Sequence, residues 1–222
     1  SATVKIGNSG LVEYNNLYDT GHLQSDGSMI QFTEDEQDGA ICRYNWLHDT
    51  EKYGARFDHS GDADGTNGTM HHNVAWNCES GGIMVKGNYH NTHNNTVFGN
   101  DSGLTKNQLI VLYENDAGNE NSTTANNAAD SIAAHRSNSY TSNPVPGTYY
   151  SNYNGYQEDE GTVESMLVDP RNFDFRPIVN SALDNLSAGA YDASDPNPWT
   201  AGASRIWQAM EHPILGCTNQ TA

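Results

Sequence analysis

The run DHSGDADGTNG, from Asp58 to Gly68, gathers oxygen-bearing side chains that could bind a cation. It offers Asp58, Asp62, Asp64 and Asn67, with glycines between them that allow a tight loop. Oxygen ligands arranged around glycines suit Ca²⁺. The run lacks the glutamate that completes an EF-hand loop, so we expect an irregular calcium loop, with a solvated acidic turn as the alternative.

Four histidines form a second group with possible chemistry: His71, His72, His90 and His93. Imidazoles bind transition metals, and they carry protons near neutral pH. In the alignment given below, His71 and His93 share one column with Arg43. The alternative is an exposed ladder of imidazoles on a strand face.

A repeat positions these side chains. Four segments align, each around an asparagine: VEYNNLYDT from Val12, CRYNWLHDT from Cys42, MHHNVAWNC from Met70 and THNNTVFGN from Thr92. The aligned asparagines are Asn15, Asn45, Asn73 and Asn95, separated by 30, 28 and 22 residues. Such a period is that of one turn of a large solenoid.

A second set of segments follows the first, with apolar residues at alternate positions: MIQFT from Met29, GARFD from Gly54, GIMVK from Gly82 and QLIVL from Gln108. Alternation with period two predicts strands. Each coil therefore carries at least two short strands. We predict an all-β fold, a right-handed parallel β-helix (β-solenoid) with irregular loops and a short C-terminal helix.

The β-helix is expected to form one domain over residues 1–222. Its coils run to about residue 140, and closing strands and a tail follow from about residue 141. We expect the polar stretch after Leu112 to leave the solenoid, with one further coil from Ile132 to Asn138, and NPVPGTYYSNYNGY to be a loop. The segment MLVDPRNFDFRPIVNSALDNLSAGAYD reads as a strand-rich closing region, and residues 203–211 as a capping helix.

The aligned asparagines suggest a mechanism for stacking the coils. An asparagine side chain both donates and accepts hydrogen bonds, so equivalent amides in successive coils can form a ladder. Asparagine also tolerates the left-handed backbone conformation that sharp corners require. Cys42 shares a column with Val12 and Met70, which predicts a buried thiol.

Charge limits the possible partners. The chain has 28 acidic against 10 basic residues and a formal net charge of −18. A surface this negative repels nucleic acid and anionic lipid and attracts divalent cations, so we expect neither nucleic-acid binding nor membrane insertion. This composition is typical of a secreted, extracellular or cell-surface protein. Sequons for N-glycosylation occur at Asn67, Asn94, Asn100, Asn121, Asn185 and Asn219.

The run from Tyr44 to Asn100, followed by LVDPRNFDFRPIVNSALDNLSAGAYD, resembles right-handed β-helix proteins of the pectin-lyase-like superfamily. It is similar to secreted relatives of chondroitinase B and the alginate lyases. The resemblance implies β-elimination on a uronate polysaccharide, with a lysine as base, an arginine as acid and Ca²⁺ on the substrate carboxylate. Lys86 and Arg56 are the candidates, on neighbouring coils and offset by two positions. Their order departs from that of those lyases, in which the lysine comes first.

Two functions follow from these patterns. One is a structural or glycan-associated module that self-associates end to end into a filament, because the repeat begins almost at the first residue. The other is a polysaccharide lyase or hydrolase with Arg56, Lys86 and His90 as catalytic residues. Its substrate contacts would come from Asp58, Arg43, His71 and His93. An ion pair of Asp58 with Arg56 or Lys86 is the structural alternative for those charges.

Overall fold

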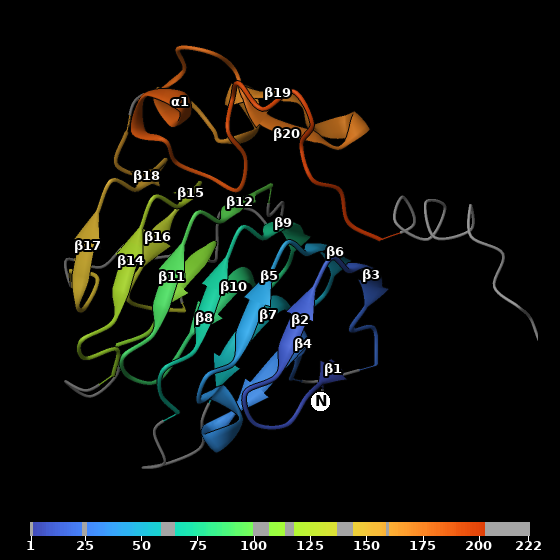
Figure 1. The fold of residues 1–222 in the computed structure, drawn as a ribbon, viewed down its shortest axis with the longest axis vertical. Coiled ribbons are helices and arrows are strands. Elements are labelled where there is room, and N and C mark those ends of the chain that lie inside the picture. Colours follow the sequence, from blue (N-terminus) through green and yellow to red (C-terminus); the bar gives the residue numbers. More distant parts are fainter. Residues whose placement is uncertain are drawn as a thin grey trace, which may run out of the picture.

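The computed structural model describes residues 2–23, 26–58, 65–99, 107–113, 118–136, 144–158 and 160–202. In this part of the chain, short strands stack coil upon coil into three parallel sheets, which together form a β-solenoid (Figure 1). The all-β solenoid predicted from the repeat is confirmed. No helix in the described ranges is long and apolar enough to cross a membrane.

Each sheet takes one strand from each coil, and neighbouring strands in a sheet are successive coils. Sheet A contains β1 (Ala2–Lys5), β4 (Ser28–Thr33), β7 (Tyr53–Asp58), β10 (Gly81–Val85), β13 (Leu109–Val111) and β16 (Ile132–Ala133). Sheet B contains β2 (Leu11–Glu13), β5 (Ile41–Arg43), β8 (Thr69–His71), β11 (Asn91–His93), β14 (Thr123–Ala125) and β17 (Thr148–Tyr150). Sheet C contains β3 (Asn16–Thr20), β6 (Trp46–Thr50), β9 (Val74–Cys78), β12 (Thr96–Phe98), β15 (Ala128–Ala129) and β18 (Tyr153–Asn154).

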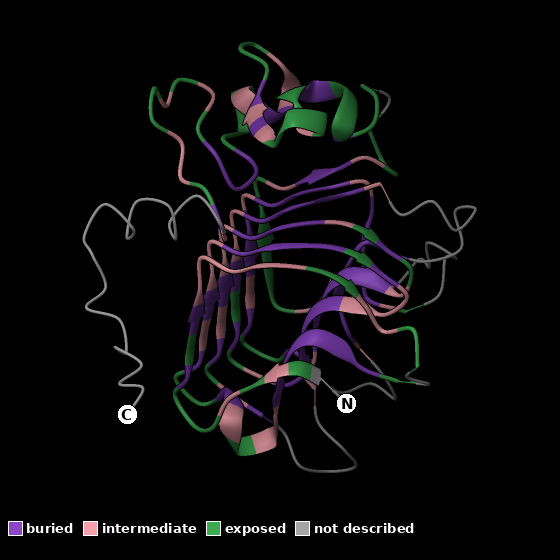
Figure 2. Cartoon of the chain, turned by 90° about the vertical axis from the view of Figure 1, so that its right-hand side faces the viewer, coloured by how far each residue is buried: buried purple, intermediate pink, exposed green. Residues whose placement is uncertain are grey.

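The alignment of the sequence segments gives the register of the strands. Cys42 pairs with Val12 on one side and Met70 on the other, as predicted. Its side chain is fully buried, and burial raises the pKa of the thiol to about 12. Alternate residues of all three sheets point inward and form one apolar core, which appears as buried strand segments in Figure 2.

A sharp corner divides each asparagine-containing segment into two strands, one in sheet B and one in sheet C. The residue at the corner has a left-handed backbone, with φ between 51° and 58° at Tyr14, Tyr44, His72, Asn94, Asn126 and Ser151. We call these six residues the corner column. This conformation costs a non-glycine residue about 1–2 kcal/mol. The left-handed position therefore belongs to the residue before each ladder asparagine, which corrects the expectation from the sequence.

The asparagine ladder is present and longer than predicted. The Nδ2 group of each asparagine donates to Oδ1 of the next, over 2.9–3.0 Å, along Asn15, Asn45, Asn73, Asn95, Asn127 and Asn152. The same Oδ1 also accepts the backbone N–H of the preceding asparagine. Because each amide is satisfied in this way, polar groups line a buried corner without the penalty of unpaired donors.

Two expectations about the later coils were wrong. The polar stretch after Leu112 does not leave the solenoid throughout, since it contributes β14 and β15. β16 lies where the further coil from Ile132 was expected. The segment expected to be a loop contributes β17 and β18. Small side chains such as Thr124 and Ala129 occupy inward positions there, so the apolar alternation is faint, while the ladder asparagines Asn127 and Asn152 are retained.

The closing region lies along the outer face of sheet C (Figure 1). It contains the antiparallel pair β19 (Leu167–Asp169) and β20 (Asp174–Pro177) and the short helix α1 (Ala182–Leu186). Three 3₁₀ turns complete the described elements: η1 (Glu34–Gln37), η2 (Glu164–Met166) and η3 (Pro170–Asn172). The helix predicted at 203–211 lies outside the described residues.

A second apolar cluster joins this C-terminal segment, residues 160–202, to the solenoid. Trp46, Val74 and Phe98 of sheet C pack against Phe175 and Tyr191. From β6 to β18, sheet C is therefore largely buried on both faces, in the manner of a core sheet rather than a surface one, whereas β3 stays partly exposed. The strand-rich closing region expected from the sequence is a cover that completes the core.

Candidate functional site

The outer face of sheet A carries the arginine and lysine that the resemblance singled out. Arg56 is paired with Met84 of the next coil, as the alignment predicted. Its guanidinium is 4% exposed and contacts Asp26 at 2.9 Å and Asp58 at 3.2 Å. The Arg56 contact lowers the pKa of Asp26. Arg56 is thus held in an ion-pair network that includes Asp58, as the structural alternative to a catalytic role predicted. Lys86 is half-buried on the following coil.

His90 does not line an open groove with those residues, contrary to expectation. It is 1% exposed, and its ring stacks on Phe57 with centroids 4.8 Å apart. Its Nδ1 accepts the backbone N–H of Gly68 at 3.0 Å. These contacts place the imidazole inside the coil stack, because the neighbouring Phe57 belongs to the apolar core.

Of the expected calcium ligands, the structure describes two, Asp58 and Asn67, and each contacts a different partner. Asp62 and Asp64 lie outside the described residues. Asp58 is engaged by Arg56, and Asn67 is exposed, with Nδ2 donating to Asp38 Oδ1 at 3.2 Å. Calcium binding by this loop stays a prediction.

The sequons differ in access. The asparagines Asn67, Asn121 and Asn185 are exposed. Asn94 is half-buried, and its Nδ2 donates to the carbonyl of Gly189 at 3.3 Å. Asn100 and Asn219 lie outside the described residues. Glycosylation at the exposed sites stays a prediction.

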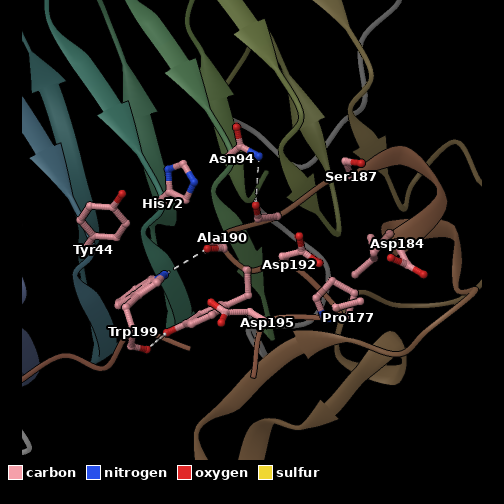
Figure 3. Close-up of a pocket in the computed structure, with 14 residues that line it drawn as sticks. Tyr44, His72, Asn94, Pro177, Asp184, Ser187, Ala190, Asp192, Asp195 and Trp199 are labelled. Atoms are coloured by element: carbon pink, nitrogen blue, oxygen red, sulfur yellow. Dashed lines mark hydrogen bonds between the residues drawn. The ribbon is translucent and has the colours of Figure 1, made fainter. Parts of the chain in front are cut away.

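A cleft of about 380 Å³ lies between the corner column and the C-terminal segment (Figure 3). Tyr44, His72 and Asn94 line it from the solenoid. The C-terminal segment contributes the remaining wall, formed by Pro177, Leu183, Asp184, Ser187, Gly189, Ala190, Tyr191, Asp192, Ala193, Asp195 and Trp199. The cleft as a whole could not be predicted from the sequence, because its two walls lie far apart in the chain.

Backbone contacts fix the C-terminal wall against the corners. The N–H of Gly189 donates to the carbonyl of Asn126, and the N–H of Gly202 donates to that of Tyr14. Between them, the N–H of Ala190 donates to the hydroxyl of Thr96 at 2.8 Å. The segment thus runs back along the corner column, from the later coils toward the first.

Aromatic rings gather at one end of the cleft. Tyr44 stacks on Tyr14, with centroids 5.0 Å apart, and meets the edge of Trp199 at 5.2 Å. Trp199 in turn stacks on Tyr191 at 4.5 Å, and its Nε1 donates to the carbonyl of Ala190 (Figure 3). Interlocked rings of this kind are rigid, so they form a preformed platform.

Acidic and amide groups occupy the rest of the wall. Asp184, Asp192 and Asp195 bring carboxylates, and Asn94 brings an amide. The backbone N–H and hydroxyl of Ser194 lower the pKa of Asp192, which keeps it ionised. Among the described residues that line the cleft, none is a lysine or arginine. The cleft therefore offers acceptors and aromatic faces to a ligand that is neutral or positively charged.

Three histidines lie together beside the cleft. His71 and His93 stack in one column next to Arg43, as predicted, with centroids 4.9 Å apart. His72, at the corner, turns its ring perpendicular to both, and its Nδ1 lies 2.8 Å from Nδ1 of His71. Burial, together with the other imidazoles, lowers the pKa of His71 and His72 to about 4, so both are neutral at pH 7.

A signal for part of this site was present in the sequence. Tyr14, Tyr44, His72 and Asn94 occupy the same position in the four aligned segments, directly before the ladder asparagine. That position points outward, because the asparagine after it points inward. Comparison of the chain with protein-family models, curated proteins and solved structures gave no match.

Proposed function

We propose that the protein is an extracellular, glycan-associated β-solenoid module that binds neutral carbohydrate in the cleft between the corner column and the C-terminal segment. The proposal includes membership of the pectin-lyase-like superfamily, supported by the coil motifs and by the parallel β-helix architecture. The observation that carries the binding function is the combination of Tyr44 and Trp199 with carboxylates and an amide in one cleft.

The chemistry of a sugar matches that combination. A pyranose ring has an apolar face of C–H groups, which packs on an aromatic ring, and a rim of hydroxyls, which donate to carboxylates and amides. Binding sites for small molecules typically join apolar surface with a few oriented polar groups. Here Tyr44 and Trp199 supply the apolar surface, and Asp192 and Asn94 supply the polar groups.

Charge favours neutral over acidic glycans. The chain carries a formal charge of −18, and the cleft contributes Asp184, Asp192 and Asp195. A uronate would bring further negative charge toward these carboxylates and would be repelled. The lyase alternative has less support, because the Arg56 guanidinium is committed to Asp26 and Asp58 and is 4% exposed.

Isothermal titration with neutral and acidic oligosaccharides tests the proposal. Xylo-, manno- and gluco-oligosaccharides are the neutral set, and oligomers of galacturonate and mannuronate are the acidic set. We expect binding from the neutral set, and a loss of at least about tenfold in affinity in Tyr44→Asn, since one stacking surface contributes about 1.4 kcal/mol or more. Asparagine tolerates the left-handed backbone at this corner, so the variant should fold.

Tyr89→Asn is the matched control. Tyr89 also has a left-handed backbone, with φ of 57°, and is exposed away from the cleft. It should bind as the wild type does. Binding that is confined to the acidic set, or that is weakened equally by both variants, would contradict the proposal.

A further inference from the structure

We propose that His71, His72 and His93 form a transition-metal site of the zinc class at the corner of sheets B and C. The proposal concerns the three imidazoles alone and does not depend on carbohydrate binding. Their candidate ligand atoms all lie within 4.8 Å of one another. Imidazole nitrogen is a preferred ligand of Zn²⁺, Co²⁺, Ni²⁺ and Cu²⁺.

The nitrogen atoms of His71 and His72 already lie almost as two ligands of one metal ion would. Their Nδ1 atoms are 2.8 Å apart and their ring planes are 87° apart. Two nitrogens on a tetrahedral zinc ion, each about 2.0–2.1 Å from it, are about 3.3 Å apart. A small separation of the two rings would place a metal between them. The ring whose Nδ1 carries the proton would bind as its other neutral tautomer, with that proton on Nε2, so both rings stay neutral.

His93 supplies the third ligand after one side-chain rotation. Its ring is parallel to that of His71, within 4°, so the in-plane lone pairs of the two rings cannot meet at one point. The Nδ1 of His93 contacts Oδ1 of Asn94 at 3.1 Å. Rotation of the His93 ring toward His72, to which it is already perpendicular, breaks this contact and completes a three-imidazole set.

The surrounding charges permit a cation. Arg43 is a positive group on the coil before His71, but its guanidinium is paired with Glu13 at 2.8 Å. The chain as a whole is strongly acidic. His72 also lines the cleft, so the fourth position of a tetrahedral ion would adjoin that space and be open to water or to an oxygen of a bound molecule.

The test is a titration of the full chain, first freed of metal with a chelator. Zn²⁺ is followed by calorimetry, and Co²⁺ by its visible d–d absorption, which reports on coordination geometry. We expect one tight site per chain and a tetrahedral Co²⁺ spectrum. His72→Asn and His71→Thr should each weaken Zn²⁺ binding at least about tenfold, because even the loss of an outer-shell partner costs about 10–100-fold.

The variants are chosen to fold. Asparagine occupies the equivalent corner in two other coils. Threonine is already found in strands of this sheet, at Thr69 and Thr123, so it suits a strand position such as that of His71. His22→Asn is the control, because His22 lies on the surface between Asp19 and Glu51 and reports on adventitious binding by an acidic surface. Circular dichroism and thermal unfolding verify the fold of every variant.

Two results would overturn the proposal: no Zn²⁺ site in the wild type, or affinity that falls as much in His22→Asn as in His72→Asn. Tyr44→Asn separates this inference from the proposed function. It should weaken carbohydrate binding and leave one Co²⁺ site per chain, because Tyr44 packs on His71 and His72 while all three imidazoles of the proposed site are retained.

Discussion

The indole Nε1 of Trp46 donates a hydrogen bond to the hydroxyl of Tyr191 over 3.0 Å, although the two residues are 145 positions apart. Trp46 belongs to the second strand of sheet C, and Tyr191 to the C-terminal segment. The hydroxyl of Tyr191 donates onward to the carbonyl of Trp199 at 3.0 Å. One buried tyrosine therefore connects the solenoid, the cover and the aromatic end of the cleft.

Removal of this hydroxyl should destabilise the whole domain. Tyr191→Phe leaves the buried indole N–H of Trp46 without its acceptor, and we expect a loss of about 1–3 kcal/mol in the free energy of unfolding. Urea denaturation, followed by tryptophan fluorescence, measures it. Tyr89→Phe, at an exposed tyrosine, should have no effect. An unchanged midpoint in Tyr191→Phe would mean that the hydrogen bond from Trp46 contributes nothing to stability.

The asparagine ladder should be sensitive at its centre. Asn73→Ala removes the acceptor of two donors on Asn45, its backbone N–H and its Nδ2, and also the donor to Asn95. We expect a loss of about 3 kcal/mol or more, since each buried unpaired group costs about 1–3 kcal/mol. Asn91→Thr, at an exposed asparagine on a neighbouring strand, is the control and should change stability little. Equal midpoints for the two variants would argue against a structural role for the ladder.

Arg56 separates a structural from a catalytic role. Arg56→Met should destabilise the protein by about 3 kcal/mol, because it leaves Asp58 next to a desolvated site without its counter-charge. Asp26→Asn should cost far less, because the Asp26 carboxylate is 73% exposed. The measurement is thermal or urea unfolding at neutral pH. A fully stable Arg56→Met variant with altered action on uronate polymers, detected by ultraviolet absorbance of an unsaturated product, would instead favour the lyase.

The histidine cluster predicts how stability changes with pH. Burial lowers the pKa of His71 and His72 to about 4, whereas histidines in the unfolded chain titrate near 6.5. The unfolded state therefore binds more protons between these values, so the stability contributed by the neutral rings is present above about pH 6.5 and is lost as the pH falls toward about 4. We expect a decrease on the order of 2 kcal/mol for metal-free protein.

Urea unfolding at several pH values across that window measures the decrease. The double variant His71→Thr/His72→Asn should have a flatter profile. The pKa of His22 is raised by Asp19 and Glu51, so His22→Asn should not flatten the loss. A profile that is identical in the wild type and the double variant would contradict this origin of the pH dependence.

The sequence was sufficient to predict the fold where a residue type has one structural role. Asparagine at the same position of each aligned segment predicted the coils, and alternating apolar residues predicted the register of sheet A, including the pairing of Arg56 with Met84. The later coils were missed because Thr124 and Ala129 fill the interior with small side chains. A segment with a weak apolar pattern can still form a strand when its coil retains the corner residue and the ladder asparagine.

The cleft could not be predicted from the sequence, because it depends on how the C-terminal segment lies on the solenoid. Nothing in the spacing of Trp199 or Asp192 relates them to Tyr44 or His72. Their proximity follows from the burial of Trp46 and Phe98 beneath Phe175 and Tyr191, which is a property of packing. The histidine column was visible in the alignment, but the approach of the His72 ring to His71 was not, since it depends on the left-handed corner.

The amide ladder gives the solenoid a polarity along its axis. Every step from Asn15 to Asn152 runs from an Nδ2 donor to an Oδ1 acceptor in the next coil, so all six side-chain dipoles point the same way along the axis. A strand placed before β2, from the same polypeptide or from another molecule, must present donors to Asn15. One placed after β17 must present acceptors. Copies of this fold can therefore continue the ladder only head to tail. Pairing of two N-terminal ends would set acceptor against acceptor, and pairing of two C-terminal ends would set donor against donor.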